Sequence, residues 1–246
     1  MIIQQETWLP SPRDVHLSGV EVHVWRASLD RDASEVEKLR ATLTADERER
    51  AQRFHFDRDR LRFVVARGVL REILGRYLRC PPGLIRFAYN EYGKPELSED
   101  GGGLRFNVSH SHGMALYACV LGREVGVDIE LLRDDFANLE VAERFFSKAE
   151  ICALGSLPAH LRTQAFFNCW TRKEAYIKAL GEGLSHPLDC FTVSLAPGEP
   201  ARLISTDKDW LEADRWSIAD LKPFRGYAAA VAVRGSNSEL HCWEWQ

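Results

Sequence analysis

The stretch that decides the fold is Trp170-Thr171-Arg172-Lys173-Glu174-Ala175-Tyr176-Ile177-Lys178, within a helix that its spacing predicts over residues 162–180. On a 3.6-residue period, one stripe combines apolar and charged side chains: Phe167, Trp170, Glu174, Ile177 and Lys178. The aromatic and aliphatic members favour an inward-facing stripe. A carboxylate held there needs a partner, and a metal ion would serve.

The simpler interpretation is an exposed ion pair between Glu174 and Lys178, which lie four residues apart. Such a pair stabilises a helix by only about 0.2–0.5 kcal/mol. It is the ordinary reading of a solvated stripe, whereas Phe166 and Phe167 argue that this stripe is buried. Both interpretations stay open until the stripe is placed.

Two further acidic residues, Asp128 and Glu130, lie in a predicted hairpin. Residues 114–121 read as one strand, Gly122-Arg123 as a tight turn and residues 124–129 as the return strand. Side chains alternate along a strand, so Asp128 and Glu130 share one face. Two adjacent carboxylates repel unless a cation lies between them, and all-oxygen ligation favours Mg²⁺ over zinc, with Mn²⁺ equally acceptable. An ordinary polar strand face is the alternative.

Five motifs occur in a fixed order: Tyr92-Gly93-Lys94-Pro95, Phe106-Asn107-Val108-Ser109-His110-Ser111, Gly126-Val127-Asp128-Ile129-Glu130, Phe146-Ser147-Lys148-Ala149-Glu150, and Trp170 to Lys178 followed by Gly181-Glu182-Gly183. Together they resemble the signature of 4'-phosphopantetheinyl transferases. The full-length, pseudodimeric type related to the surfactin synthetase-activating enzyme is the most similar. The resemblance covers residues 54–194.

The resemblance implies transfer of the 4'-phosphopantetheine moiety of coenzyme A to a serine hydroxyl of an apo acyl- or peptidyl-carrier protein. The products are the holo carrier protein and 3',5'-ADP. The resemblance implies Mg²⁺ as cofactor, held by Asp128, Glu130 and Glu174, and catalytic roles for Glu174, Lys178 and Glu150. The general base is left open between Glu150 and Glu174, acting directly or through water on the metal.

Glu150 has a competing explanation within its own helix. Ser147 and Glu150 have the spacing of a capping box, in which each side chain bonds the backbone N–H of the other residue. Capping alone would account for both residues, so a chemical role for Glu150 rests on the resemblance.

For coenzyme A itself, the resemblance implies contacts from Arg58, Arg62, Lys94, Ser109 and His110, with Lys178 at the same phosphates. Arginine suits phosphate because its planar fork donates two hydrogen bonds at once. For the arginines, the alternative to binding coenzyme A is a solvated face on or just before a helix over residues 61–78. For Ser109, the alternative is that its side chain caps a local turn. A zinc pair of His110 and His112 lacks further ligands at a suitable spacing. A Ser-His-Asp hydrolase lacks a Gly-x-Ser-x-Gly elbow.

Composition is consistent with an enzyme. The chain has 246 residues, 45% of them hydrophobic, and a net charge of −4, which gives no reason to expect nucleic acid or membrane as a partner. The six cysteines form no Cys-x-x-Cys pair, and no secretory signal or membrane-spanning run is present. We therefore expect reduced thiols in a cytoplasmic protein.

The order helix, strand, strand, apolar strand occurs twice along the chain, and by resemblance we expect an α+β fold of two similar lobes. Each lobe would be a helix packed on a small antiparallel sheet, with a pseudo-twofold between them and the active site at their junction. We place the N-terminal lobe, with the coenzyme A nucleotide contacts, at 1–123 and the C-terminal lobe, with the metal-binding and catalytic motifs, at 124–246. One chain supplying both lobes indicates a monomer. The alternative function is a non-catalytic binder of coenzyme A or carrier protein on the same fold; the carrier, its pathway and the tolerance for acyl-coenzyme A stay open.

Overall fold

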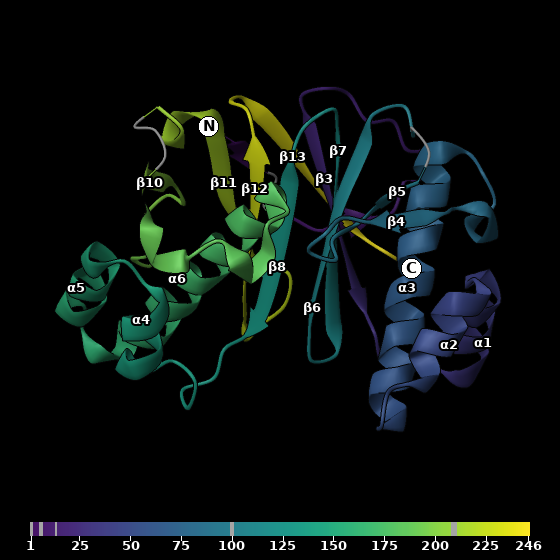
Figure 1. The fold of residues 1–246 in the computed structure, drawn as a ribbon, viewed down its shortest axis with the longest axis horizontal. Helices are drawn as coiled ribbons and strands as arrows, with labels where there is room; N and C mark the ends of the chain where they lie inside the picture. Colours follow the sequence, from purple (N-terminus) through teal and green to yellow (C-terminus); the bar gives the residue numbers. More distant parts are fainter. Residues whose placement is uncertain (1, 5–6, 13, 99–100, 208–210) are drawn as a thin grey trace.

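The computed structural model describes residues 2–4, 7–12, 14–98, 101–207 and 211–246. It has a mixed α+β fold in which two sheets face each other and helices cover their outer faces (Figure 1). Helix α3 (Asp57–Leu78) packs on one sheet and helix α6 (Ala159–Leu180) on the other. Both outer layers agree with the prediction of a helix on a small sheet.

The first half of the chain runs from a strand through helices to hairpins: β3 (Glu21–Ser28), α1 (Ala33–Thr42), α2 (Ala45–Gln52), α3, β4 (Phe87–Tyr89), β5 (Pro95–Leu97), β6 (Leu104–Ser111) and β7 (Met114–Leu121). The second half repeats that order: β8 (Val125–Leu131), α4 (Leu139–Phe145), α5 (Lys148–Ser156), α6, β9 (Phe191–Val193), β10 (Leu203–Thr206), β11 (Trp216–Leu221) and β12 (Tyr227–Arg234). The strand pairing repeats as well. Strand β7 lies between β3 and β6, and strand β12 lies between β8 and β11; all four of these strand pairs are antiparallel.

The two halves also carry the same buried ion pair. Glu47, the third residue of α2, pairs with Arg71 at 2.8 Å, and Glu150, the third residue of α5, pairs with Lys173 at 2.8 Å. Arg71 is the fifteenth residue of the 22-residue helix α3, and Lys173 is the fifteenth of the 22-residue helix α6. In each half the pair therefore joins the long helix to the helix before it at an equivalent point.

The core is divided by the sheets. Aliphatic side chains from both sheets fill the layer between them, including Val24, Val120, Val127 and Val231. The aromatic residues Trp25 and Tyr117 face α3 on the far side of the first sheet. Phe167 and Ile177 of the predicted stripe are buried in the cluster under α6, as is Phe166 beside them, whereas Trp170, Glu174 and Lys178 of the same stripe are partly exposed. The interpretation of α6 as a solvated helix with an exposed Glu-Lys pair is therefore wrong.

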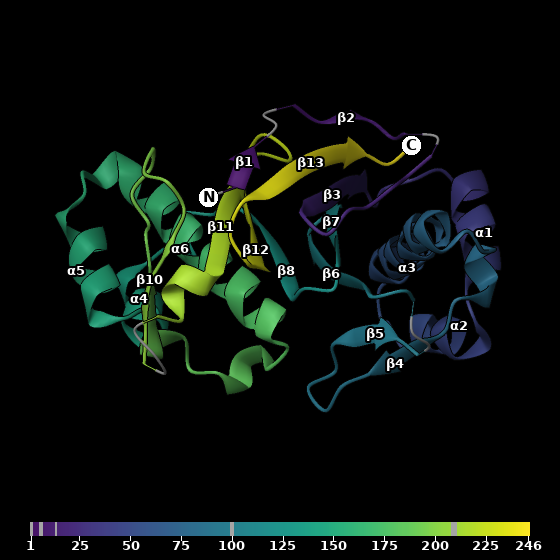
Figure 2. The same cartoon turned by 90° about the horizontal axis from the view of Figure 1, so that it is seen from above.

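The C-terminal strand lies in the sheet formed by the first half of the chain. Strand β13 (Ser238–Glu244) pairs in parallel with β3, and the short strands β1 (Ile2–Gln4) and β2 (Leu9–Pro10) pair with β13. Figure 2 shows β13 running from the second half across to the first sheet. Residues 238–244 thus lie in the first sheet although the sequence boundary assigns them to the second lobe, and that sheet is mixed rather than antiparallel. The strand was missed because its partner lies more than 200 residues away.

The two strands predicted around Gly122 form, but the hairpin predicted from them is wrong. Strand β7 pairs with β3 and β6, whereas β8 pairs with β12 in the facing sheet, so the turn at Gly122-Arg123 passes the chain from one sheet to the other. Strand β7 has the predicted bounds, and Gly122 turns with φ +67° before β8, which extends two residues further than expected. All six cysteines are free thiols. Within the described residues, the helices are too short or too polar to cross a lipid bilayer.

Candidate active site

Helix α6 lies directly on β8, and Gly126 is the reason it can. A Cβ at this position would collide with the backbone of α6, namely the Ala175 carbonyl oxygen and the Ala179 nitrogen. Side chains alternate along the strand, so Asp128 and Glu130 face α6 as well. Glycine in this motif therefore brings the strand carboxylates against the helix residues Glu174 and Lys178.

The Lys178 ammonium links three elements at this contact. It donates to Asp128 Oδ1 at 2.5 Å and to Ser109 Oγ at 3.0 Å, and Ser109 in turn donates to Asp128 Oδ1 at 2.9 Å. Asp128 is buried, whereas the Lys178 side chain is 28% exposed. Burial opposes the charge of Lys178, but Asp128, Glu174 and Glu130 outweigh it and raise the lysine pKa. The cation is therefore fixed at one edge of an acidic cluster.

The remaining carboxylates of the cluster hold protons more tightly than usual. Burial and the charge of Asp128 raise the pKa of Glu174 to about 7, despite the opposing effect of Lys178. The same two causes raise the pKa of Glu130, whose Oε2 accepts a hydrogen bond from Ser111 Oγ at 2.8 Å. Three partly desolvated acids beside one ammonium form a site that would bind further positive charge favourably.

Strand β6 reaches this cluster through an arrangement that sequence reasoning missed. Three of its side chains accept hydrogen bonds from every second backbone N–H of β8: Asn107 from Val127 at 2.9 Å, Ser109 from Ile129 at 3.4 Å and Ser111 from Leu131 at 3.3 Å. The spacing of two in Asn107-Val108-Ser109-His110-Ser111 was the available signal. Ser109 is thus engaged with Asp128 and β8, and its alternation with His110 separates the two residues, which excludes a Ser-His-Asp relay.

The donor set suits an oxygen-ligated divalent ion. Asp128, Glu130 and Glu174 offer only carboxylate oxygens, and Asp128 Oδ2 is buried with no hydrogen-bond partner among the described residues. In this structure the cation beside Asp128 is the Lys178 ammonium, and the three carboxylates do not all lie within 4.8 Å of one another. A shared ion would have to draw them closer. The chemistry of the residues fits the predicted metal.

Glu150 is placed differently from the other predicted catalytic residues. It is 1% exposed, and its carboxylate accepts from the backbone N–H of Ser147 and of Val193, each at 2.7 Å, and from the Lys173 ammonium at 2.8 Å. The capping box with Ser147 is complete. These contacts use Glu150 to join α5, α6 and β9, so the structure favours the capping explanation over a catalytic one.

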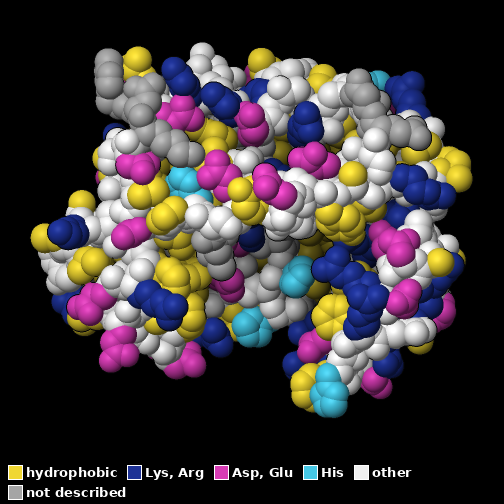
Figure 3. Space-filling model, in the orientation of Figure 1, with side chains coloured by type: hydrophobic (Ala, Val, Ile, Leu, Met, Phe, Trp, Pro, Cys, Tyr) yellow, Lys and Arg dark blue, Asp and Glu magenta, His cyan; other side chains and the backbone are white. Residues whose placement is uncertain are grey.

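Predicted contacts for the nucleotide of coenzyme A gather at a recess of about 310 Å³ between α3 and the end of β6. Arg58, Arg62 and His110 line it together with the aromatic rings of Phe54 and Phe63. Figure 3 shows this face hollowed below its centre, with lysine or arginine side chains gathered on the right-hand rim and histidines nearby. The surrounding protein and the Lys178 charge lower the pKa of His110, which favours a neutral ring.

The two arginines are not equivalent. Arg62 donates from Nε and Nη2 to the two oxygens of Asp30, at 2.7 and 2.9 Å, so its fork already holds a carboxylate. Arg58 is 70% exposed, and its one ion pair with another described residue is a 3.4 Å contact with Asp59. Arg58 is therefore the more accessible donor for an incoming phosphate.

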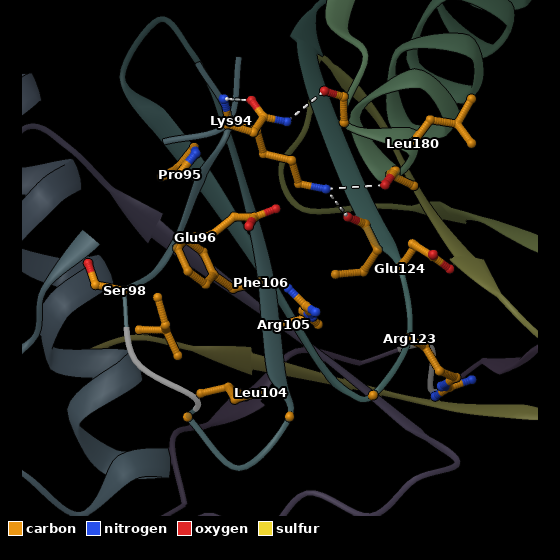
Figure 4. A pocket seen from close by; sticks show the side chains of 18 residues that line it. Lys94, Pro95, Glu96, Ser98, Leu104, Arg105, Phe106, Arg123, Glu124 and Leu180 are labelled. Atoms are coloured by element: carbon orange, nitrogen blue, oxygen red, sulfur yellow. Dashed lines mark hydrogen bonds between the residues drawn. The ribbon is translucent and has the colours of Figure 1, made fainter. Parts of the chain in front are cut away.

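Lys94 lies away from that recess. Its ammonium donates to the carbonyl oxygens of Lys178 at 2.7 Å, Ala179 at 3.2 Å and Val125 at 3.4 Å, so it caps the C-terminal end of α6 (Figure 4). Burial lowers its pKa to about 8, in spite of nearby Glu96. All three of its N–H donors have acceptors, which makes Lys94 a structural cap here rather than a free phosphate donor.

Comparisons with known proteins agree with the motifs. A model of the 4'-phosphopantetheinyl transferase superfamily matches residues 124–232, and a model of the 4'-phosphopantetheinyl transferase N-terminal region matches residues 25–121. The 4'-phosphopantetheinyl transferase HetI of Nostoc sp. is 42% identical over 98% of this chain and 99% of its own. The 4'-phosphopantetheinyl transferase Sfp of Bacillus subtilis is 35% identical over 68% of this chain and 74% of its own. A Thermotoga maritima holo-[acyl-carrier-protein] synthase structure covers 46% of this chain and 62% of its own, with 22% identity and a TM-score of 0.37.

Proposed function

This chain belongs to the 4'-phosphopantetheinyl transferase family, and from that membership we propose that it transfers the 4'-phosphopantetheine arm of coenzyme A to a serine of an apo acyl- or peptidyl-carrier protein. The products are the holo carrier protein and 3',5'-ADP, and the metal ion is Mg²⁺. The observation that carries the proposal is the convergence of Asp128, Glu130, Glu174 and Lys178 between β8 and α6.

Asp128, Glu130 and Glu174 are the residues that would hold Mg²⁺. When bound there, the ion supplies positive charge against the pyrophosphate of coenzyme A, an effect worth several kcal/mol. Phosphoryl transfer depends mainly on positioning and on charge neutralisation, which suits a rigid strand and helix that present their side chains from two sides.

Lys178 and Glu174 carry the remaining chemistry. The Lys178 ammonium offsets the charge that develops on the departing nucleotide. Glu174 takes the proton of the attacking serine hydroxyl, because Glu150 is enclosed by its own three partners. Without a metal ion, burial and Asp128 raise the pKa of Glu174 to about 7, and bound Mg²⁺ would lower it and so favour the carboxylate form that accepts a proton.

The recess between α3 and β6 would receive the phosphoadenosine end of coenzyme A. Arg58 supplies an accessible guanidinium, and Arg62 is positioned beside it by Asp30. His110 lines the same recess, and the preceding residue of β6, Ser109, donates a hydrogen bond to Asp128. Adjacent residues of β6 therefore connect the recess to the acidic cluster.

We also propose that the chain is a duplicated pair of lobes related by a pseudo-twofold, with the boundary near Arg123 and with β13 returned to the first sheet. The repeated element order, the equivalent buried ion pairs and the two family models that meet at residues 121–124 support this proposal. Because one chain supplies both lobes, it would act as a monomer. The free cysteines are consistent with a cytoplasmic location.

The test is the mass of an apo carrier protein after incubation with coenzyme A, Mg²⁺ and this chain. We expect one phosphopantetheine per target serine, and a loss of at least about 100-fold in rate for Asp128→Asn, given the several kcal/mol that a catalytic metal supplies. The exposed Asp214→Asn is the matched control. If carriers from fatty acid, polyketide and peptide synthesis all gain no mass, the non-catalytic binder is the better reading; normal turnover by folded Asp128→Asn would remove the metal assignment.

A further inference from the structure

Two histidines and a glutamate meet on the first sheet, away from the acidic cluster. Strands β3 and β13 pair in parallel with His23 directly beside His241. Glu21 precedes His23 by two residues and so projects from the same face of β3. Residues from the start and the end of the chain thereby form one group.

The ligand atoms of these side chains all lie within 4.8 Å of one another, and this is the single such group of three found among the described residues. His241 Nε2 lies 3.7 Å from Glu21 Oε1, which is too long for a hydrogen bond. That nitrogen is buried and has no hydrogen-bond partner among the described residues. Ser18 N–H binds the other glutamate oxygen, Oε2, at 2.6 Å, so Oε1 is the oxygen turned to the histidine.

The surroundings hold the two rings in place. His23 Nδ1 contacts the Tyr77 hydroxyl at 2.9 Å, and Trp25 Nε1 donates to the same hydroxyl at 2.9 Å. A partner on Nδ1 orients a histidine and leaves Nε2 as the ligand atom, as in many metal sites. The His241 ring stacks on Trp243, with an interplanar angle of 8°.

We propose that Glu21, His23 and His241 bind a divalent transition metal ion of the zinc class. Two imidazoles and one carboxylate form a three-ligand set that suits Zn²⁺, with water as a fourth ligand. The site would tie β13 to β3 and so fasten the C-terminal strand to the first sheet. Glu21 and His241 are partly exposed, at 25% and 31% of their side chains, which gives the ion an entry path.

A simple ion pair between Glu21 and His241 is the competing explanation. It leaves His241 Nε2 at 3.7 Å from its partner and assigns no part to His23. A metal ion would use all three side chains as ligands. It would also give a partner to His241 Nε2, which is buried and has no hydrogen bond to the described residues. The two explanations differ in whether the protein binds Zn²⁺ at this place.

The experiment is calorimetric titration of the chelator-treated full chain with Zn²⁺, together with the visible absorption of Co²⁺ added in its place. We compare the wild type with His241→Ala and Glu21→Gln, and use His160→Ala, which removes an exposed imidazole, as the matched control. We expect the control to bind as the wild type does. Each ligand variant should bind at least about 10-fold more weakly, since even indirect changes at metal sites cost that much.

Thermal unfolding gives a second readout that does not depend on catalysis. Zn²⁺ should raise the melting temperature of the wild type and of His160→Ala by more than that of His241→Ala, because only the first two keep the site that fastens β13. Far-ultraviolet circular dichroism confirms that each variant is folded. The proposal is overturned if the wild type binds no Zn²⁺, or if His241→Ala and Glu21→Gln bind and respond to it as the wild type does.

Discussion

Replacing Glu150 with glutamine separates its structural role from a catalytic one. The carboxylate is enclosed by two backbone N–H donors and the Lys173 ammonium, with exposures of 1% for Glu150 and 0% for Lys173. Glutamine keeps the shape but replaces one acceptor oxygen with an NH₂ group. The NH₂ group would face a backbone N–H, so two donors would point at each other. The substitution would also remove the negative charge that pairs with Lys173.

The expected cost follows from this geometry. Breaking a buried ion pair by removing one charge destabilises a protein by about 3–5 kcal/mol. The Lys173 ammonium keeps the carbonyl oxygens of Leu188 at 2.7 Å and Phe191 at 2.6 Å, which solvate it partly. We therefore expect the lower end, a loss of about 3 kcal/mol in the free energy of unfolding.

The assay combines urea unfolding with the rate of carrier-protein modification under conditions where the variant is folded. Folded Glu150→Gln should retain wild-type turnover. The exposed Glu143→Gln should change stability by no more than about 0.5 kcal/mol. A variant of unchanged stability whose turnover falls about 100-fold would refute the structural assignment and restore Glu150 as a base.

Three further predictions concern the same framework. Glu47→Gln should also lose about 3 kcal/mol in urea unfolding while folded protein keeps its turnover, since Arg71 repeats the role of Lys173; a stable variant would contradict the repeat. Gly126→Ala should lower the free energy of unfolding by at least about 1–3 kcal/mol, because its methyl group collides with α6; calorimetry showing unchanged stability would disprove this contact. Glu174 has a raised pKa of about 7, so the folded protein binds a proton that the unfolded chain releases, and stability in a metal chelator should fall as pH rises from about 4.5 to about 7. Glu174→Gln should remove that fall in urea titrations at each pH, and an unaltered profile would show that burial does not perturb this group.

Much of the local structure could be predicted because it depends on local periods. The alternation of Val125, Val127 and Ile129 with Asp128 and Glu130 set the face of β8, and the burial of Phe166 and Phe167 set that of α6. These patterns correctly placed Asp128 and Glu130 on one face of β8, and Glu174 and Lys178 on helix α6. Their motifs also resembled the family to which the chain belongs.

The partners of those side chains were decided only by tertiary structure. Lys178 meets Ser109 across 69 residues, Lys94 caps α6 across more than 80, and β13 joins β3 from the opposite end of the chain. A periodic pattern tells which way a side chain points on its own element, but it carries no record of which distant backbone will lie opposite. That choice follows from the packing of the two sheets, where Gly126 permits the approach of α6 and the buried donors and acceptors must find one another.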